Sequence, residues 1–204
     1  MADQLLIFAR HPALGQVKTR LARTEGPEAA LQVYRELLRH TRAAADGLAV
    51  AKILWLAGDE PATGSAFEAW AGYQQRPQPA GDLGERMHQA FAAAFDSGAT
   101  AAVIIGTDCP ELTTEHLNAA FQQLATHEVV VGPARDGGYY LLGMRNLVPE
   151  FFQNKAWSTD AVLATTLADA ARLGLRVAHL PVLSDVDNAE DLAAWRHRTA
   201  MQNS

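Results

Sequence analysis

Cysteine is rare in this sequence, and long apolar runs and an excess of basic residues are missing. A single cysteine, Cys109, among 204 residues excludes an internal disulfide and fits a reducing compartment. No apolar run approaches the roughly 18 residues of a membrane-spanning helix, and the initial run LLIFA is too short for a signal peptide. With 17 Lys and Arg against 23 Asp and Glu, the formal charge is −6, which argues against a nucleic acid partner. We therefore expect a cytoplasmic protein that binds neither nucleic acid nor a membrane.

Familiar chemical motifs are missing as well. The segment GQVKT lacks the second glycine of a Walker A loop, and no GxGxxG motif follows an expected strand, so neither standard nucleotide fingerprint is present. The seven histidines show no HExxH or paired spacing, which argues against a zinc site. Cys109 has no histidine at a recognisable partner position, and we expect it to be an inert thiol.

The sequence does contain a regular alternation of expected strands and helices. Continuous apolar runs such as AAVIIG and EVVVG are typical of strands buried on both faces of a parallel sheet. Pro27 at a first helical position, Thr113 and Asn188 as caps, and Ser158 as an opening residue mark helix starts. We predict strands at 4–8, 49–58, 101–106, 128–132, 138–144 and 175–182, and helices at 27–46, 64–70, 85–98, 114–127, 159–174 and 189–198. This pattern predicts one three-layer α/β/α domain over 1–204, with a mostly parallel, doubly wound sheet.

A cationic loop follows the first expected strand of this acidic chain. The stretch FARHPALGQVKTRLAR contains Arg10, Lys18 and Arg20 without an acid, and Gly15 would let the backbone approach an anion closely. Ligands of such sheets bind at the carboxyl ends of the strands, so this loop should meet the acidic segments TDCP, PARDGGYY and LSDVDNAED. The arrangement indicates a phosphate pocket, although Lys18 and Arg20 at the surface of a helical first turn is an alternative interpretation.

Magnesium chemistry would fit these acidic segments. Mg²⁺ takes one or two protein carboxylates and completes its coordination with waters and substrate phosphates. Asp108, together with Asp185 or Asp187, could provide the carboxylates. Purely structural alternatives exist for each position: a turn at Asp108, a helix start at Asp187, and a plain hairpin turn at residues 137–138.

Six motifs in order resemble one known family over nearly the full chain. They are FARHPALGQVKTRLA, GDLGERM, GTDCPELT, GPARDGGYYLLG, AWST and DVDNAEDL. The set is similar to small bacterial transferases once catalogued only as a domain of unknown function, glycosyltransferase-like and linked to radical-SAM genes and arsenosugar biosynthesis. That family resembles the GT-A, or nucleotide-diphospho-sugar transferase, fold, which molybdenum-cofactor guanylyltransferase and phospholactate guanylyltransferase share as more distant relatives.

The resemblance implies roles for individual positions. The nucleotide-binding positions are in the first loop and in GDLGER: Arg10, Gly15, Lys18, Arg20, Gly81, Asp82, Gly84 and Arg86. The substrate-binding positions follow the later strands: Gly137, Gly138, Tyr139 and Trp157. The resemblance implies that Asp108 binds the metal, Mg²⁺ or Mn²⁺. Because TDCP has one acid where the family fold commonly has Asp-x-Asp, we expect Asp187 to be the second metal ligand. The implied catalytic residues are Lys18, Asp108 and Asp136, with Asp136 as the candidate general base.

We therefore expect a metal-dependent glycosyltransferase-like enzyme that uses a nucleotide-diphosphate sugar and a small-molecule acceptor. A nucleotidyltransferase that releases pyrophosphate is the first alternative, although the loop RHPALGQVK replaces the glycine-rich loop usual in such relatives. A non-catalytic nucleotide-binding module is the second alternative. We also expect that the segment YYLLG at 139–143, which looks exposed, could form the edge of a homodimer.

Overall fold

The computed structural model describes residues 2–58 and 70–202 and contains a seven-stranded sheet. Its strands are β1 (Gln4–Arg10), β2 (Ala51–Ala57), β3 (Gln74–Pro77), β4 (Ala102–Ile105), β5 (Val129–Pro133), β6 (Tyr139–Met144) and β7 (Val177–His179). The spatial order is β3-β2-β1-β4-β6-β5-β7, and β6 runs antiparallel to both of its neighbours while the other pairs are parallel. This confirms the predicted α/β fold with a mostly parallel sheet.

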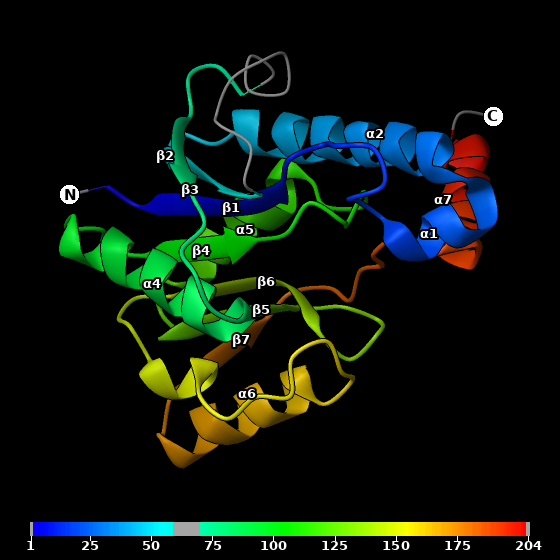
Figure 1. Cartoon of the computed structure of the whole chain (residues 1–204). Helices are drawn as coiled ribbons and strands as arrows, with labels where there is room; N and C mark the ends of the chain where they lie inside the picture. Colours follow the sequence, from blue (N-terminus) through cyan, green and yellow to red (C-terminus); the bar gives the residue numbers. More distant parts are fainter. Residues whose placement is uncertain (1, 59–69, 203–204) are drawn as a thin grey trace.

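Helices cover both faces of the sheet (Figure 1). They are α1 (Thr19–Glu25), α2 (Pro27–Asp46), α4 (Leu83–Asp96), α5 (Thr114–Gln123), the 3-10 helix η1 (Pro149–Phe152), α6 (Val162–Arg172) and α7 (Ala189–Gln202). Helices α2 and α5 pack on one face, and α4, η1 and α6 pack on the other. Helices α1 and α7 join one end of α2 in a separate apolar cluster around Leu21, Leu37 and Trp195.

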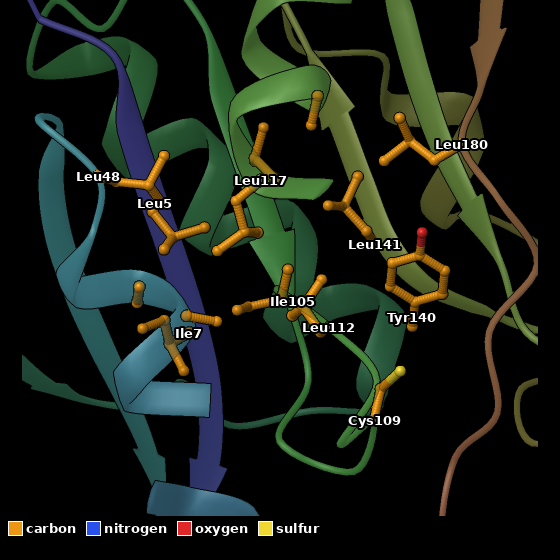
Figure 2. Packing of buried hydrophobic residues seen from close by; sticks show 14 of the residues in the cluster. Leu5, Ile7, Leu48, Ile105, Cys109, Leu112, Leu117, Tyr140, Leu141 and Leu180 are labelled. Carbon is orange, nitrogen blue, oxygen red and sulfur yellow. The ribbon is translucent and has the colours of Figure 1, made fainter. Parts of the chain in front are cut away.

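Alternation along β1 explains the two main apolar layers. Leu5 and Ile7 point into the α2/α5 layer, whereas Leu6 points into the α4/η1 layer, as expected for a strand with a side-chain period of two. Figure 2 shows the first layer, in which Leu5, Ile105 and Leu117 meet from β1, β4 and α5. All four residues of β4 are buried, which confirms the prediction from AAVIIG.

Several element boundaries differ from the predictions. The predicted helix at 159–174 begins only at Val162, because Ser158 has a left-handed backbone with φ of 64° and the helix cap is Ala161. Strand β3 and the 3-10 helix η1 were not predicted, since each is too short to show a periodicity. Helix α1 was anticipated only in the alternative interpretation of Lys18 and Arg20. Most of the predicted short helix at 64–70 lies outside the described residues.

The dimer-edge prediction for 139–143 is wrong. These residues form most of β6, which lies between β4 and β5 and therefore has no open edge. Tyr140 to Gly143 are buried because both faces of this strand are covered by helices.

Within 2–58 and 70–202, no helix combines the length and the apolar character needed to cross a membrane.

Candidate active site

A cavity of about 740 Å³ lies where the loops after several strands meet. It is lined by the end of β1 and the loop that follows, by residues 104–109 around the end of β4, by the β5–β6 turn and by the segment after β7. The first turns of α4 and residues 157–159 complete the wall. The structure therefore brings one cationic loop and three acidic segments to a common cavity at the edge of the sheet.

Lys18 is the central side chain of this cavity. Its Nζ lies 2.5 Å from Oδ1 of Asp108 and 2.9 Å from Oδ1 of Asp187. The Lys18 side chain is only 6% exposed, and each carboxylate is 43% exposed. Burial alone would lower the pKa of Lys18, but the two neighbouring carboxylates outweigh it and raise the pKa, so the ammonium stays charged. An ammonium thus holds together two acids that come from distant parts of the chain.

The backbone at Lys18 has an unusual conformation that is fixed by its neighbours. Lys18 adopts a left-handed conformation, with φ of 47° and ψ of 46°, immediately before α1. This conformation is unfavourable for a residue with a side chain and is maintained only where the surroundings fix it. Val17 is 3% exposed and anchors the preceding residue, while the strand end is held by Tyr34, whose hydroxyl accepts from the Arg10 amide and donates to the Arg10 carbonyl.

The two acids are placed by backbone contacts between their loops. The amide of Val186 donates to the carbonyl of Asp108 at 2.9 Å, which ties the segment after β7 to the segment after β4. Asn188 Oδ1 accepts from the amides of Glu190 and Asp191 and so caps α7, as predicted. Because Asn188 does this, the side chain of Asp187 remains available to Lys18.

Negative charge accumulates on this side of the cavity. Burial, followed by the charges of Asp108, Asp136 and Asp187, raises the pKa of Asp185 to about 7. Asp185 lines the cavity, yet the resemblance assigns it no role. From the residues alone, Asp185 was an alternative to Asp187 as a metal carboxylate, since both follow the last strand in SDVDN.

Three arginines bring positive charge to the other side. Arg10, Arg20 and Arg86 line the cavity, and Arg86 Nε donates to the carbonyl of Gly81 at 2.8 Å. In the described part of the chain, no carboxylate forms an ion pair with the guanidinium of Arg10 or Arg20. These two side chains are exposed and can accept an anionic ligand.

The remaining predicted positions divide into lining and supporting residues. Asp136, Gly138, Tyr139 and Trp157 line the cavity, and Asp136 Oδ1 accepts from the Gly138 amide at 2.9 Å in the β5–β6 turn. Predicted positions outside the lining are Gly15, Gly81, Asp82, Gly84 and Gly137.

Asp82 has a clear structural role. Its side chain accepts from the Glu85 amide, and its own amide donates to Glu85 Oε2, both at 2.9 Å. These bonds form a capping box at the start of α4.

Two of the glycines allow the Trp157 segment to pack closely. A Cβ atom on Gly84 would lie 2.5 Å from Trp157 Cζ2, so the indole rests directly on the first turn of α4. A Cβ atom on Gly137 would lie 2.3 Å from the carbonyl oxygen of Asp160, and φ of 88° at Gly137 also favours glycine. The buried ammonium of Lys155 pairs with Asp169 on α6 and fixes the start of the segment. The motifs GDLGER and RDGGYY therefore position Trp157.

Gly84→Ala should disturb this packing. The added methyl group cannot fit against the indole unless Trp157 moves, and overpacking of this kind typically costs about 1–3 kcal/mol. We expect a melting temperature lower by about 2–10 °C in differential scanning calorimetry, together with a shift of the Trp157 fluorescence. As a control, Gly106→Ala adds a methyl group with no neighbour within 4 Å at a glycine whose φ is not positive, and it should keep native stability. Native stability in Gly84→Ala would contradict the packing argument.

The described residues contain no complete metal site. Within the described ranges, no three His, Cys, Asp or Glu side chains are grouped closely enough to hold a metal ion by themselves. Asp108 and Asp187 nevertheless form a pair of oxygen donors around a common cation, Lys18 Nζ. Mg²⁺ and Mn²⁺ sites with few carboxylates draw further ligands from water and phosphate.

Comparison with known proteins identifies the family of this chain and solved structures with a similar fold. Residues 39–159 match the family described as "Uncharacterized protein conserved in bacteria (DUF2064)". A protein of Desulfovibrio desulfuricans G20, assigned to the nucleotide-diphospho-sugar transferases, is 32% identical, with a TM-score of 0.88 over 94% of this chain and 85% of that chain. No match was found among curated proteins.

Two solved structures with low identity share the fold. CMP:2-keto-3-deoxy-manno-octonic acid synthetase in complex with CTP is 14% identical, with a TM-score of 0.59 over 99% of this chain and all of that chain. Glucosyl-3-phosphoglycerate synthase from Mycobacterium tuberculosis was solved in complex with Mn²⁺, UDP and glucosyl-3-phosphoglycerate. It is 11% identical, with a TM-score of 0.57 over 95% of this chain and 75% of that chain. The chain therefore belongs to the DUF2064 family and has the fold of the nucleotide-diphospho-sugar transferases.

Proposed function

We propose that this protein is a metal-dependent transferase that moves a sugar from a nucleotide-diphosphate sugar to a small acceptor. The observation that carries the proposal is the meeting of Lys18, Asp108 and Asp187 in a cavity that also contains unpaired arginines. A structural relative in complex with UDP and Mn²⁺ supports it, whereas the synthetase in complex with CTP supports only nucleotide binding by this fold. We also propose that 1–204 acts as one GT-A-like domain.

The acidic pair fits a divalent metal. The two carboxylates already share one positive charge, and a third carboxylate, Asp185, lines the same cavity. Asp108 and Asp187 would hold Mg²⁺ or Mn²⁺, with the remaining ligands from water and the diphosphate. When bound, the metal would supply charge stabilisation for the departing diphosphate.

Lys18 and the arginines would bind the donor. With a divalent cation between the carboxylates, the Lys18 ammonium is repelled from its present position and is free to contact the diphosphate beside it. Arg10 and Arg20 would contact the same phosphates, because a guanidinium donates two parallel hydrogen bonds to phosphate oxygens. We place Gly15 and residues 81–86 near the rest of the nucleotide.

In the transfer step, an acceptor hydroxyl oxygen bonds to the anomeric carbon as the bond from that carbon to the diphosphate oxygen breaks. The hydroxyl proton passes to Asp136, and the nucleoside diphosphate leaves with the electron pair. Asp136 is suited to this role because its side chain is exposed and its residue lines the cavity in the turn between β5 and β6. Gly138, Tyr139 and Trp157 would contact the sugar or the acceptor.

Product analysis separates this proposal from its alternatives. The protein is incubated with Mg²⁺ or Mn²⁺ and a panel of sugar nucleotides or nucleoside triphosphates, each together with candidate acceptors. Release of a nucleoside diphosphate supports glycosyl transfer, and release of pyrophosphate identifies a nucleotidyltransferase. Ligand binding, seen as a raised melting temperature without either product, would identify a non-catalytic nucleotide-binding module.

Asp136→Asn tests the general base. The substitution keeps the shape of the turn, in which the side-chain oxygen accepts from the Gly138 amide, but it removes the basic carboxylate. We expect turnover to fall about a hundredfold or more, with donor affinity largely unchanged, as measured by steady-state kinetics and calorimetry. Turnover near the native rate would show that Asp136 is only a turn residue.

A further inference from the structure

Glu111 connects the two loops that bring Asp108 and Asp187 together. It lies three residues after Asp108, in the turn between β4 and α5 that contains the motif GTDCPELT. Its Oε2 accepts a hydrogen bond from the backbone amide of Ser184 at 3.0 Å. Ser184 belongs to the segment after β7 and lies three residues before Asp187. The Glu111 carboxylate therefore holds the loop of one acid against the loop of the other.

Ser184 is also fixed on its other side, by the β5–β6 turn. Its hydroxyl accepts from Nε of Arg135 at 3.0 Å, and the amide of Arg135 donates to the carbonyl of Leu183 at 3.1 Å. Arg135 directly precedes Asp136 in this turn. The segment after β7 is therefore anchored to the turn, and the side chain of Glu111 aligns the β4–α5 loop with both.

Only one further hydrogen bond joins residues 106–113 to residues 183–188 in the described chain. It runs from the amide of Val186 to the carbonyl of Asp108, at 2.9 Å. Loss of the Glu111 carboxylate would therefore remove one of the two hydrogen bonds that hold these loops together. The relative position of the two acids would then be set less firmly, because two loops joined by a single hydrogen bond can rotate about it.

Arg198 on α7 contacts the other carboxylate oxygen of Glu111. Its Nε lies 2.8 Å from Oε1, but the N–H is not aligned with that oxygen, so the contact is an ion pair without a hydrogen bond. The side chains of Arg198 and Glu111 are 41% and 26% exposed, and ion pairs with such exposure contribute little to stability. The charge-assisted hydrogen bond to the Ser184 amide is therefore the contact of Glu111 that positions the loops.

We propose that Glu111 is a positioning residue, whose hydrogen bond to the Ser184 amide sets the separation of the Asp108 and Asp187 carboxylates. Among the described residues, those that line the cavity do not include Glu111, so it acts through the two loops and not on a ligand. The inference rests on the proposed function, in which the two carboxylates hold Mg²⁺ or Mn²⁺. Loss of a group that orients metal ligands typically lowers metal affinity by about 10–100-fold.

Glu111→Ala and Glu111→Gln together test this role. Both variants lose the same negative charge, so the general attraction of the site for a cation falls equally in the two. Gln keeps a side-chain oxygen that can accept from the Ser184 amide, whereas Ala has none. We expect the Mn²⁺ affinity of the nucleotide-free protein, measured by electron paramagnetic resonance of free Mn²⁺, to be about tenfold or more lower in Glu111→Ala than in Glu111→Gln. Equal affinities in the two variants would overturn the inference.

Glu128→Ala is the matched control for a loss of stability. Oε2 of Glu128 accepts from the amide of Arg176 at 2.9 Å, and Oε1 pairs with the guanidinium of the same residue. Glu128 therefore makes the same two kinds of contact as Glu111, but just before β5 and β7 begin and outside the cavity lining. Glu128→Ala should keep native Mn²⁺ affinity. An equal loss of affinity in Glu128→Ala and Glu111→Ala would assign the effect to general destabilisation and refute the positioning role.

Hydrogen exchange of the metal-free protein separates this inference from the proposed function. With EDTA present, the Val186 amide should exchange about tenfold or more faster in Glu111→Ala than in Glu111→Gln, because its segment opens more easily. The buried amide of Val103 in β4 reports on global unfolding and should change less. If the native protein binds no Mn²⁺, the metal-dependent function fails and the Val186 amide alone decides the inference. Faster exchange in Glu111→Ala then supports the positioning role, and equal exchange in both variants overturns it.

Discussion

Asp108→Asn should abolish metal-enhanced nucleotide binding and lower turnover by about a thousandfold or more. Asp108 is one of only two carboxylates that contact Lys18 Nζ in the described chain, so its loss leaves Asp187 as a single charged ligand. Charge stabilisation of a leaving group is usually the largest single contribution to catalysis, so its loss should cause a large fall in turnover. Calorimetric titration of UDP with and without Mn²⁺ measures the binding, and nucleoside diphosphate release measures the turnover.

The stability of the ligand-free protein should change little in this variant. Asn removes one partner of Lys18 and also removes repulsion from Asp185 and Asp187, and these effects oppose each other. Because the Asp108 side chain is 43% exposed, the net change should stay within about 1 kcal/mol, or about 2–4 °C in melting temperature. Asp96→Asn is the control for charge alone. Retention of Mn²⁺-dependent UDP binding in Asp108→Asn would show that the metal binds elsewhere.

Lys18→Met should change nucleotide and metal affinity in opposite directions. Met keeps much of the buried aliphatic stem but removes the ammonium. UDP affinity should weaken by about 1.5–3 kcal/mol, the value of a charge-assisted hydrogen bond, and turnover should fall at least in proportion. Mn²⁺ affinity of the nucleotide-free protein should rise, since the ammonium that competes for Asp108 and Asp187 is gone.

Electron paramagnetic resonance of free Mn²⁺ measures the metal affinity directly. Lys52→Met is the matched control, because Lys52 Nζ donates to the Leu48 carbonyl and does not line the cavity. Lower Mn²⁺ affinity in Lys18→Met, with Lys52→Met unchanged, would contradict a shared position for the ammonium and the metal. It would assign Lys18 a fixed role in holding the two loops together.

The α/β fold, the buried strands and most helices could be predicted from the sequence, because they depend on local patterns. Apolar runs such as that of β4 bury both faces of a strand, and Pro27 and Asn188 mark helix starts by their own backbone and side-chain chemistry. The convergence of the cationic loop with Asp108, Asp136 and Asp187 was also predictable, since the carboxyl ends of parallel strands meet at one edge.

The partners of individual side chains were decided only by the tertiary structure. Lys18 and Asp187 are 169 residues apart, and no local pattern shows that an ammonium lies between two carboxylates. The same holds for Trp157 against Gly84 and for Tyr34 at the end of β1, where contact depends on how α4, α2 and the loops pack. The sequence by itself determined which elements form and which charged groups reach the sheet edge, because periodicity and strand direction are local properties. Only the packed chain determined which charges pair, since ion-pair geometry and burial depend on atoms brought together from remote segments.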